Sequence, residues 1–350
     1  MIKPTAIQLV TRGSKLALWQ AHMAELAISR TGVLAHVYVK KSLADHQPNT
    51  QLKDLAVEQG VKSSFVGTLE RELINGHADM AVHSLKDLPT TLPRGLGLVG
   101  YLARHSPYDV CLVKKTVRKS IPPVLSHQTV KQFSSLTFAT SSLRRQAFLM
   151  PHIPQVSFQD IRGNIESRLR KALENKSLDG LILSHASLAR LKDDPITSQY
   201  LQSFHMSQVD CHLLVPSPGQ GVIALEMNVD HQLWPKMTTV SCHLTEFCCS
   251  LEREIVGALG GHCLMPIGCY VNAHYYPTPE LTILLAIASP SGSHRILWQT
   301  KTRVALSQVY DMSKRATLFL ALKRDAYQYV LDQKGEKIYM SLNRPFPNKP

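Results

Sequence analysis

The sequence predicts an α/β fold divided among more than one domain. Short apolar runs typical of buried strands alternate with segments whose apolar residues recur every three or four positions, as in helices. The length of 350 residues and the hydrophobic content of 44% exceed what one ordinary core needs, which favours two or three domains. Polar clusters follow several predicted strands. In α/β proteins the carboxyl ends of strands are where ligand sites are usually built.

The N-terminal region begins with a predicted strand over residues 7–11 and a helix that Ser14 can cap. A second strand is predicted over residues 35–41, and the polar segment 42–60 after it is typical of a loop over a site. Four apolar residues recur along the first helix at helical spacing and are expected to face the core: Leu16, Trp19, Met23 and Leu26.

A polar cluster follows the next predicted strand, over residues 78–83. Ser84, Lys86 and Asp87 lie directly after this strand, and Pro89 prevents a following helix from starting early. These side chains are candidates for one small charged site. The alternative is a Lys–Asp pair on a surface turn, where such pairs are common.

Basic side chains mark the start of a helix in a second α/β region. A strand is predicted over residues 136–140, Ser142 can cap the next helix, and Arg144 and Arg145 lie in its first turn. The helix dipole disfavours cations there, so two arginines beside free N–H groups indicate a carboxylate or phosphate site. The alternative is that both arginines face the solvent.

The same pattern recurs twice further along the chain. Arg162 follows a strand-like run at residues 155–159 and precedes a helix that carries Arg168, and Arg190 lies on a short helix after the predicted strand 180–184. One arginine at a helix start means little, but repeated ones at equivalent edges of a sheet suggest several acidic groups bound together.

The remaining chain first returns to the N-terminal region and then forms a third unit. The turn 216–221 leads to a predicted strand, 222–227, that crosses back to the first domain. The third unit begins with a helix over residues 245–259 and ends with a long helix, about 306–331. Residues 343–350 are expected to be disordered.

The formal net charge of +13 implies an anionic partner: nucleic acid, an acidic membrane surface, or a polycarboxylate or phosphate ligand. The basic residues occur mostly singly and have few aromatic neighbours, so nucleic acid is not favoured. No apolar stretch has the length of a membrane span, and the N-terminus lacks a signal-peptide apolar region. We therefore expect a soluble, cytoplasmic protein without a membrane partner.

Seven cysteines are distributed without paired C-x-x-C sets, and their odd number argues against a disulfide framework. Cys248–Cys249 and His262–Cys263 fit no closed zinc site. No metal is therefore predicted.

Several motifs, found in order over about the first three quarters of the chain, resemble the porphobilinogen deaminase (hydroxymethylbilane synthase) family. The matching stretches are Arg12–Ala21, Ala78–Pro89, Thr140–Ala147, Arg162–Leu169, Pro216–Gly221 and Cys263–Gly268. The resemblance implies two periplasmic-binding-protein-like (type II) domains around a cleft and a smaller α/β C-terminal domain. The implied bounds are 1–104 plus 208–228 for domain 1, 105–207 for domain 2 and 229–350 for domain 3.

The resemblance also implies a reaction: four porphobilinogen molecules are condensed head to tail onto a covalently bound dipyrromethane cofactor, ammonia is lost, and hydroxymethylbilane is released by hydrolysis. Cys263 matches the thioether attachment point of the cofactor. Asp87 matches the carboxylate that relays protons and stabilises positive charge on pyrrole nitrogens. The protein would act as a monomer.

The other matched positions serve binding. Lys62 and Phe65 match a flexible loop over the cleft with Asp45 at its base, and Gln20 matches a substrate contact. Positions that match cofactor and substrate binding, mostly to the acetate and propionate groups, are Arg12, Ser14, Ser84, Lys86, Thr140, Ser142, Arg144, Arg145, Arg162, Arg168, Arg190 and Gln220.

The sequence also departs from the family pattern. Lys15 replaces a usual proline, His262 replaces a small residue, residues 59–65 have lost most of a glycine-rich pattern, and Ser106 and Tyr108 stand where charged residues are common. Alternatives are therefore a family member impaired by its altered loop, a non-catalytic anion-binding protein with the same domains, or a nucleic-acid binder.

Overall fold

The computed structural model describes residues 6–40, 67–153, 155–261, 265–274 and 279–350. The chain forms two compact units. Met1–His105, Arg162–Asn164 and Gly221–Glu246 make unit 1, and Ser106–Ile161, Ile165–Gln220 and Phe247–Pro350 make unit 2. The division into three domains remains a prediction.

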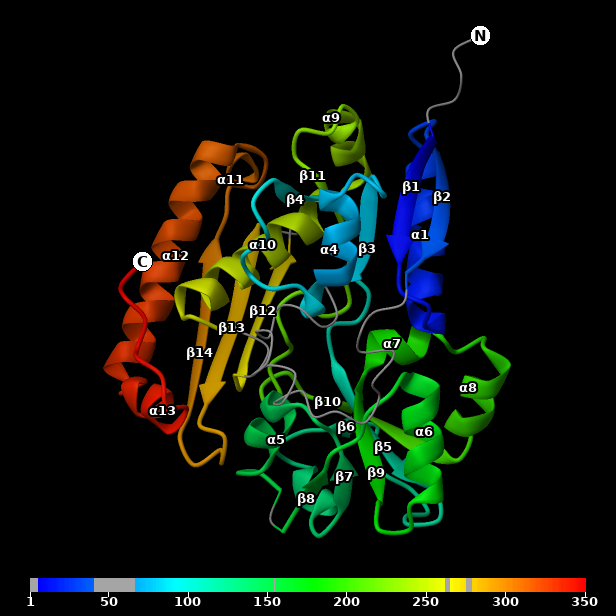
Figure 1. Ribbon diagram of the computed structural model, residues 1–350. Helices are drawn as coiled ribbons and strands as arrows, with labels where there is room; N and C mark the ends of the chain where they lie inside the picture. The colour runs from blue at the N-terminus through cyan, green and yellow to red at the C-terminus, as the bar shows by residue number, and fades with distance from the viewer. Residues whose placement is uncertain (1–5, 41–66, 154, 262–264, 275–278) are drawn as a thin grey trace. The chain divides into compact units, whose positions relative to one another are not determined.

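Unit 1 is built on a five-stranded sheet in the order β2-β1-β3-β11-β4 (Figure 1). β1 is parallel to β2 and β3, whereas β11 is antiparallel to β3 and β4, so the chain returns to this sheet as predicted. The strands are β1 Ala6–Thr11, β2 Leu34–Val39, β3 Met80–Ser84, β4 Leu96–Tyr101 and β11 Ile223–Asn228. The helical elements are α1 Lys15–Ser29, α4 Gly67–Ile74, η1 Leu85–Asp87, α9 Trp234–Met237 and η3 Thr238–Val240.

Helices α1 and α4 cover opposite faces of this sheet. Leu9 on β1 packs with Ala24 of α1, while the next residue, Val10, packs with Leu69 and Leu73 of α4. Successive strand residues point to opposite faces, so the apolar run of β1 is buried on both sides.

The buried face of α1 differs from the one predicted. Gln20, Ala21, Ala24 and Ile28 are buried, whereas Leu26 is 44% exposed. Small alanine side chains let the helix lie close to the sheet, and the bulkier Trp19 and Met23 pack at its margins.

Unit 2 contains a six-stranded sheet in the order β6-β10-β5-β9-β7-β8. β7 is parallel to both β8 and β9, and β5 is antiparallel to β9 and β10. The strands are β5 Asp109–Lys114, β6 Val124–Leu125, β7 Thr137–Ala139, β8 Ser157–Gln159, β9 Gly180–Ser184 and β10 Phe204–Val209. The helices are η2 Val130–Phe133, α5 Leu143–Leu149, α6 Ile165–Glu174, α7 His185–Arg190 and α8 Pro195–Leu201.

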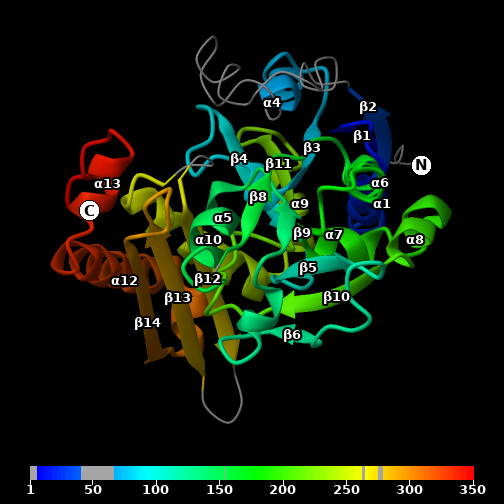
Figure 2. The ribbon, with the colours of Figure 1, turned by 90° about the horizontal axis from the view of Figure 1, so that it is seen from below.

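The C-terminal part of unit 2 forms a three-stranded antiparallel sheet, β12-β13-β14, with α12 lying along β14 (Figure 2). Leu284 and Ala286 of this sheet share one core with Phe148 and Leu213. The elements are α10 His243–Ala258, β12 Ile267–His274, β13 Glu280–Ala288, β14 Arg295–Arg303, α11 Leu306–Tyr310, α12 Met312–Asp332 and α13 Glu336–Ser341. The first residues of α10, up to Glu246, are grouped with unit 1. Two mixed sheets and a smaller antiparallel one confirm the predicted α/β class.

Two predictions for the C-terminal region were wrong. The long final helix is interrupted at Asp311, whose carboxylate caps α12 by accepting from Ser313 N. The last residues pack rather than lie free: the Phe346 ring contacts Tyr327 and Tyr339. Among the described residues, no helix combines the length and apolar character that crossing a bilayer requires.

Candidate active-site residues

The predicted site residues of unit 1 gather at one edge of its sheet. β1 and β3 are parallel neighbours, so their carboxyl ends meet at the same edge. Arg12 and Ser14 follow β1, and Ser84 ends β3. Lys86 and Asp87 lie one turn further, in η1. The sequence correctly predicted this strand-end placement.

Hydrogen bonds hold this edge together. Ser14 caps α1 by accepting from Ala17 N, and Gln20 Nε2 donates to Ser84 Oγ over 2.7 Å. Gln20 is only 3% exposed. Leu85 N donates to Val222 O, which fixes η1 beside the start of β11. Asp87 is exposed and Lys86 is half-buried. Both charged side chains therefore project from a backbone turn that these hydrogen bonds hold in place.

A buried ionisable pair lies beneath this edge, and the sequence did not reveal it. His83 Nε2 of β3 lies 2.9 Å from Glu226 Oε2 of β11, and the side chains are 5% and 0% exposed. His83 and Ser84 are adjacent strand residues and therefore point to opposite faces. A glutamate inside the apolar run of β11 was the available signal, because a buried carboxylate needs a partner.

The predicted arginines further along the chain also follow neighbouring strand ends, those of the unit 2 sheet, although Arg162 itself is grouped with unit 1. β8, β7 and β9 are adjacent and parallel, so their carboxyl ends share one edge. α5 follows β7, Arg162 follows β8, and Arg190 lies on α7 after β9. Burial lowers the pKa of the Arg190 guanidinium to about 10. Arg162 and Arg168 are half-buried.

Arg144 and Arg145 form a buried cluster with Asp109. Arg144 Nη2 donates to Asp109 Oδ2 over 2.7 Å, and Arg145 Nη2 donates to Asp109 Oδ1 over 2.8 Å. Arg144 also donates to Val215 O and Arg145 to Ile182 O. Burial lowers the pKa of Arg144, and Asp109 opposes this shift. Their predicted contact with ligand carboxylates stays a prediction.

The polar residues around these arginines are ordered by local hydrogen bonds. Ser142 caps α5 by accepting from Arg145 N, and Thr140 Oγ1 accepts from Ser142 N. Gln220 is 1% exposed, and its Nε2 donates to Pro107 O over 2.6 Å. Its position in the candidate site also remains a prediction.

A buried carboxylate holds the turn that contains Gln220. Gly219 has a φ of 71°, and its N–H donates to Glu252 Oε2 over 2.7 Å. Glu252 Oε1 accepts from Val271 N over 2.8 Å. One side chain of α10 therefore links the 216–221 turn to β12.

Several predicted positions lie outside the described residues: Asp45, Lys62, Phe65, His262 and the attachment cysteine, Cys263. The chain on either side of 262–264 is anchored. Gly261 N donates to Val256 O, and Gly261 is so close to α10 that an added Cβ would lie 2.5 Å from Val256 Cγ1. Met265 is buried.

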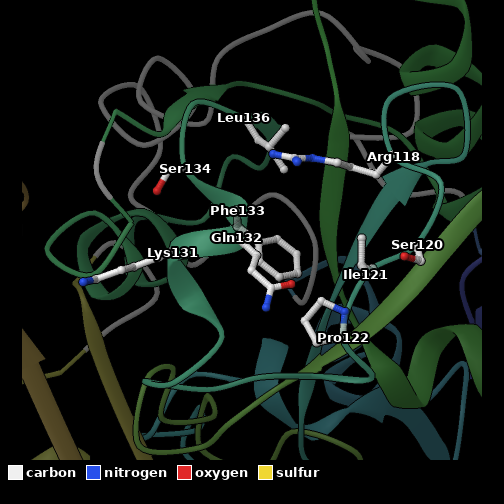
Figure 3. A pocket seen from close by; sticks show the side chains of 9 residues that line it. All are labelled: Arg118, Ser120, Ile121, Pro122, Lys131, Gln132, Phe133, Ser134 and Leu136. Carbon is white, nitrogen blue, oxygen red and sulfur yellow. The ribbon is translucent and has the colours of Figure 1, made fainter.

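A cavity of about 280 Å³ lies elsewhere in unit 2, between the segment after β5 and η2 (Figure 3). Its lining includes Arg118, Ile121 and Phe133, whose side chains are labelled in the view. None of the predicted site residues lines it.

Comparisons with known proteins agree with the motifs. Residues 7–235 match the family model "Porphobilinogen deaminase, dipyromethane cofactor binding domain". A porphobilinogen deaminase of Syntrophomonas wolfei is 37% identical over 265 residues, covering 75% of this chain and 79% of the relative. One of Chlorobium limicola is 29% identical over 337 residues, covering 95% and 97%.

Solved structures match at lower similarity. An ancestral cationic amino acid solute binding protein is 10% identical and has a TM-score of 0.38, covering 67% of this chain and 87% of that one. The family model spans more than half of the chain, and the relatives are aligned over most of their length. The chain belongs to the porphobilinogen deaminase family.

Proposed function

We propose that this protein is a porphobilinogen deaminase, which condenses four porphobilinogen molecules head to tail with loss of ammonia and releases hydroxymethylbilane. The observation that carries the proposal is the gathering of the matched side chains at strand ends. At one edge of the unit 1 sheet lie Arg12, Ser84, Lys86 and Asp87, and arginines follow three adjacent parallel strands of the unit 2 sheet.

The described side chains fit an anionic cofactor. Arg12, Arg162, Arg168 and Arg190 are basic side chains. Asp109 is already bonded to two other arginines, Arg144 and Arg145. Guanidinium groups bind carboxylates with matched geometry. Dipyrromethane, attached through Cys263, would supply the pyrrole to which the first substrate is joined.

Asp87 would perform the proton chemistry. Asp87 is exposed and lies in η1, which the hydrogen bond from Leu85 N to Val222 O fixes in place. Its carboxylate can therefore reach a bound substrate without a rearrangement of β3. An ionised carboxylate there stabilises the positive charge that develops on a pyrrole nitrogen as ammonia leaves, and it can take the ring proton afterwards. Lys86 and Ser84 would hold a substrate carboxylate beside it.

The test is Asp87→Asn in the holoenzyme. The amide keeps the shape but cannot accept a proton or carry negative charge, so we expect kcat to fall by about 10²- to 10⁴-fold. Ammonia release from porphobilinogen measures this, and thermal unfolding should be unchanged. The matched control is Asp325→Asn, an exposed aspartate of α12 that is remote in sequence from the predicted site residues, which should keep full activity. Near-normal activity of the Asp87 variant would refute the role.

Intact mass separates the enzyme from a non-catalytic anion-binding protein. Protein made in porphobilinogen-producing cells should carry the added mass of a two-pyrrole cofactor, and Cys263→Ala should not. An unmodified wild-type mass would support the non-catalytic alternative.

The resemblance also supports a monomeric, cytoplasmic enzyme of three domains, with bounds at 1–104 plus 208–228, 105–207 and 229–350. Sedimentation at working concentration tests the monomer.

A further inference from the structure

Three potential metal ligands occur on consecutive residues of unit 2, and the proposed reaction uses none of them. Asp210, Cys211 and His212 follow β10, and one ligand atom from each lies within 4.8 Å of the other two. Among the described residues, this is the one group of three such side chains so arranged.

The separations between these ligand atoms are close to those around a tetrahedral ion. Cys211 Sγ lies 3.7 Å from His212 Nδ1, and Asp210 Oδ1 lies 3.1 Å from the same nitrogen. With Zn–S near 2.3 Å and Zn–N and Zn–O near 2.0–2.2 Å, tetrahedral angles place sulfur about 3.6 Å and oxygen about 3.4 Å from nitrogen. Cys211 Sγ and an Asp210 oxygen lie within 4.8 Å of each other, so side-chain rotation would be needed to bring all three ligand atoms onto one ion.

The backbone of the triad is fixed by the surrounding structure. Asp210 N donates to Leu125 O, and Asp210 O accepts from Leu213 N and Leu214 N, both of which belong to buried residues. His212 O accepts from Arg295 Nη2 over 2.6 Å. A preorganised backbone lowers the entropic cost of placing the ligands.

The charges around the triad are compatible with a divalent cation. Arg295 is a cation bonded to the triad, through His212 O, and it also donates to His152. The pKa of His152 is lowered to about 4 by burial, with Arg295 and His127 contributing. A thiolate and a carboxylate neutralise a divalent ion, so the bound site adds little charge beside Arg295. A metal ion binds the thiolate form of cysteine, so binding would release the Cys211 thiol proton.

We propose that Asp210, Cys211 and His212 bind a thiophilic divalent cation such as Zn²⁺, with a fourth position open to water. Thiolate, imidazole and carboxylate together suit zinc rather than Mg²⁺ or Ca²⁺, which prefer oxygen ligands. This site is separate from the predicted catalytic residues, so its presence does not depend on the proposed reaction.

The test uses the full-length holoprotein and Co²⁺, which reports thiolate ligation through a ligand-to-metal charge-transfer absorption. We expect one Co²⁺ per chain, displaceable by Zn²⁺. Cys211→Ser should abolish the absorption, and His212→Gln should lower affinity at least about 100-fold. The matched control is Cys242→Ser, which removes the other half-buried described cysteine and should leave binding unchanged.

Two results would overturn the site. One is the absence of a charge-transfer band in the wild-type protein at millimolar Co²⁺, which would mean that the three side chains form a hydrogen-bonded turn and bind no metal. The other is equal binding by the wild type and Cys211→Ser, which would assign the ion to another cysteine. Neither result depends on deaminase activity.

Discussion

Single charged residues in this protein differ sharply in their surroundings. Asp109 is buried and engages two buried arginines, whereas the Arg170–Glu174 pair is about half exposed on α6. Removing one partner of a buried pair leaves an uncompensated charge in a medium of low dielectric constant, while exposed pairs are well solvated either way. The cluster on Asp109 should therefore govern the stability of unit 2 far more than surface pairs do.

Asp109→Asn should lower the free energy of unfolding by about 3–5 kcal/mol, because Arg144 and Arg145 lose their shared anion. Urea denaturation measures the change. Glu174→Gln is the control and should change it by no more than about 0.5 kcal/mol. Similar small effects in both variants would show that the buried arginines find other partners.

The sequence indicated where Arg144 and Arg145 lie but not what they contact. Their place at the start of α5 followed from the cap at Ser142. Asp109 is 35 and 36 residues away in the chain, and it reaches them because antiparallel pairing sets Asp109 opposite Ser184 at the end of β9. Such pairing depends on the tertiary fold, so local patterns cannot supply it.

At the scale of elements, the sequence predicted strand and helix positions better than buried faces. The strands near residues 7–11, 180–184 and 222–227 were confirmed almost to the residue. The buried face of α1 was predicted only in part: Trp19 and Met23 pack against the core, but Ala21, Ala24 and Ile28 form its buried centre and Leu26 is exposed. Helical spacing alone does not decide between two apolar stripes on one helix.

Contacts between elements also depend on single side chains, as Glu252 shows. Glu252→Gln keeps one acceptor oxygen but can no longer accept from both Gly219 N and Val271 N. A buried donor left without an acceptor costs about 1–3 kcal/mol. We expect that loss of stability, together with faster hydrogen exchange at one of these two amides.

Glu254→Gln on the same helix is the control, because Glu254 is 45% exposed in its pair with Lys323. It should leave both stability and exchange nearly unchanged. Unaltered exchange at Gly219 and Val271 in the Glu252 variant would mean that the carboxylate does not hold this turn.

At the scale of the molecule, the six-stranded sheet and the C-terminal three-stranded sheet of unit 2 share one hydrophobic core. Leu284, Ala286 and Ala288 of β13 pack with Phe148 and Leu213, so neither sheet buries its apolar surface without the other. The family resemblance separates these regions into domains 2 and 3. Shared burial predicts that they nevertheless unfold together.

Leu285→Ala tests this cooperativity. Leu285 is buried on the face of β13 opposite Leu284, and its truncation should cost about 2–5 kcal/mol. If the sheets unfold as one, native-state hydrogen exchange should show the same loss of opening free energy for amides of β5 and β9 as for β13. Glu280→Gln, at the partly exposed start of β13, should affect neither set. A loss confined to β12–β14 would instead show that the C-terminal sheet unfolds as an independent domain, despite the core it shares.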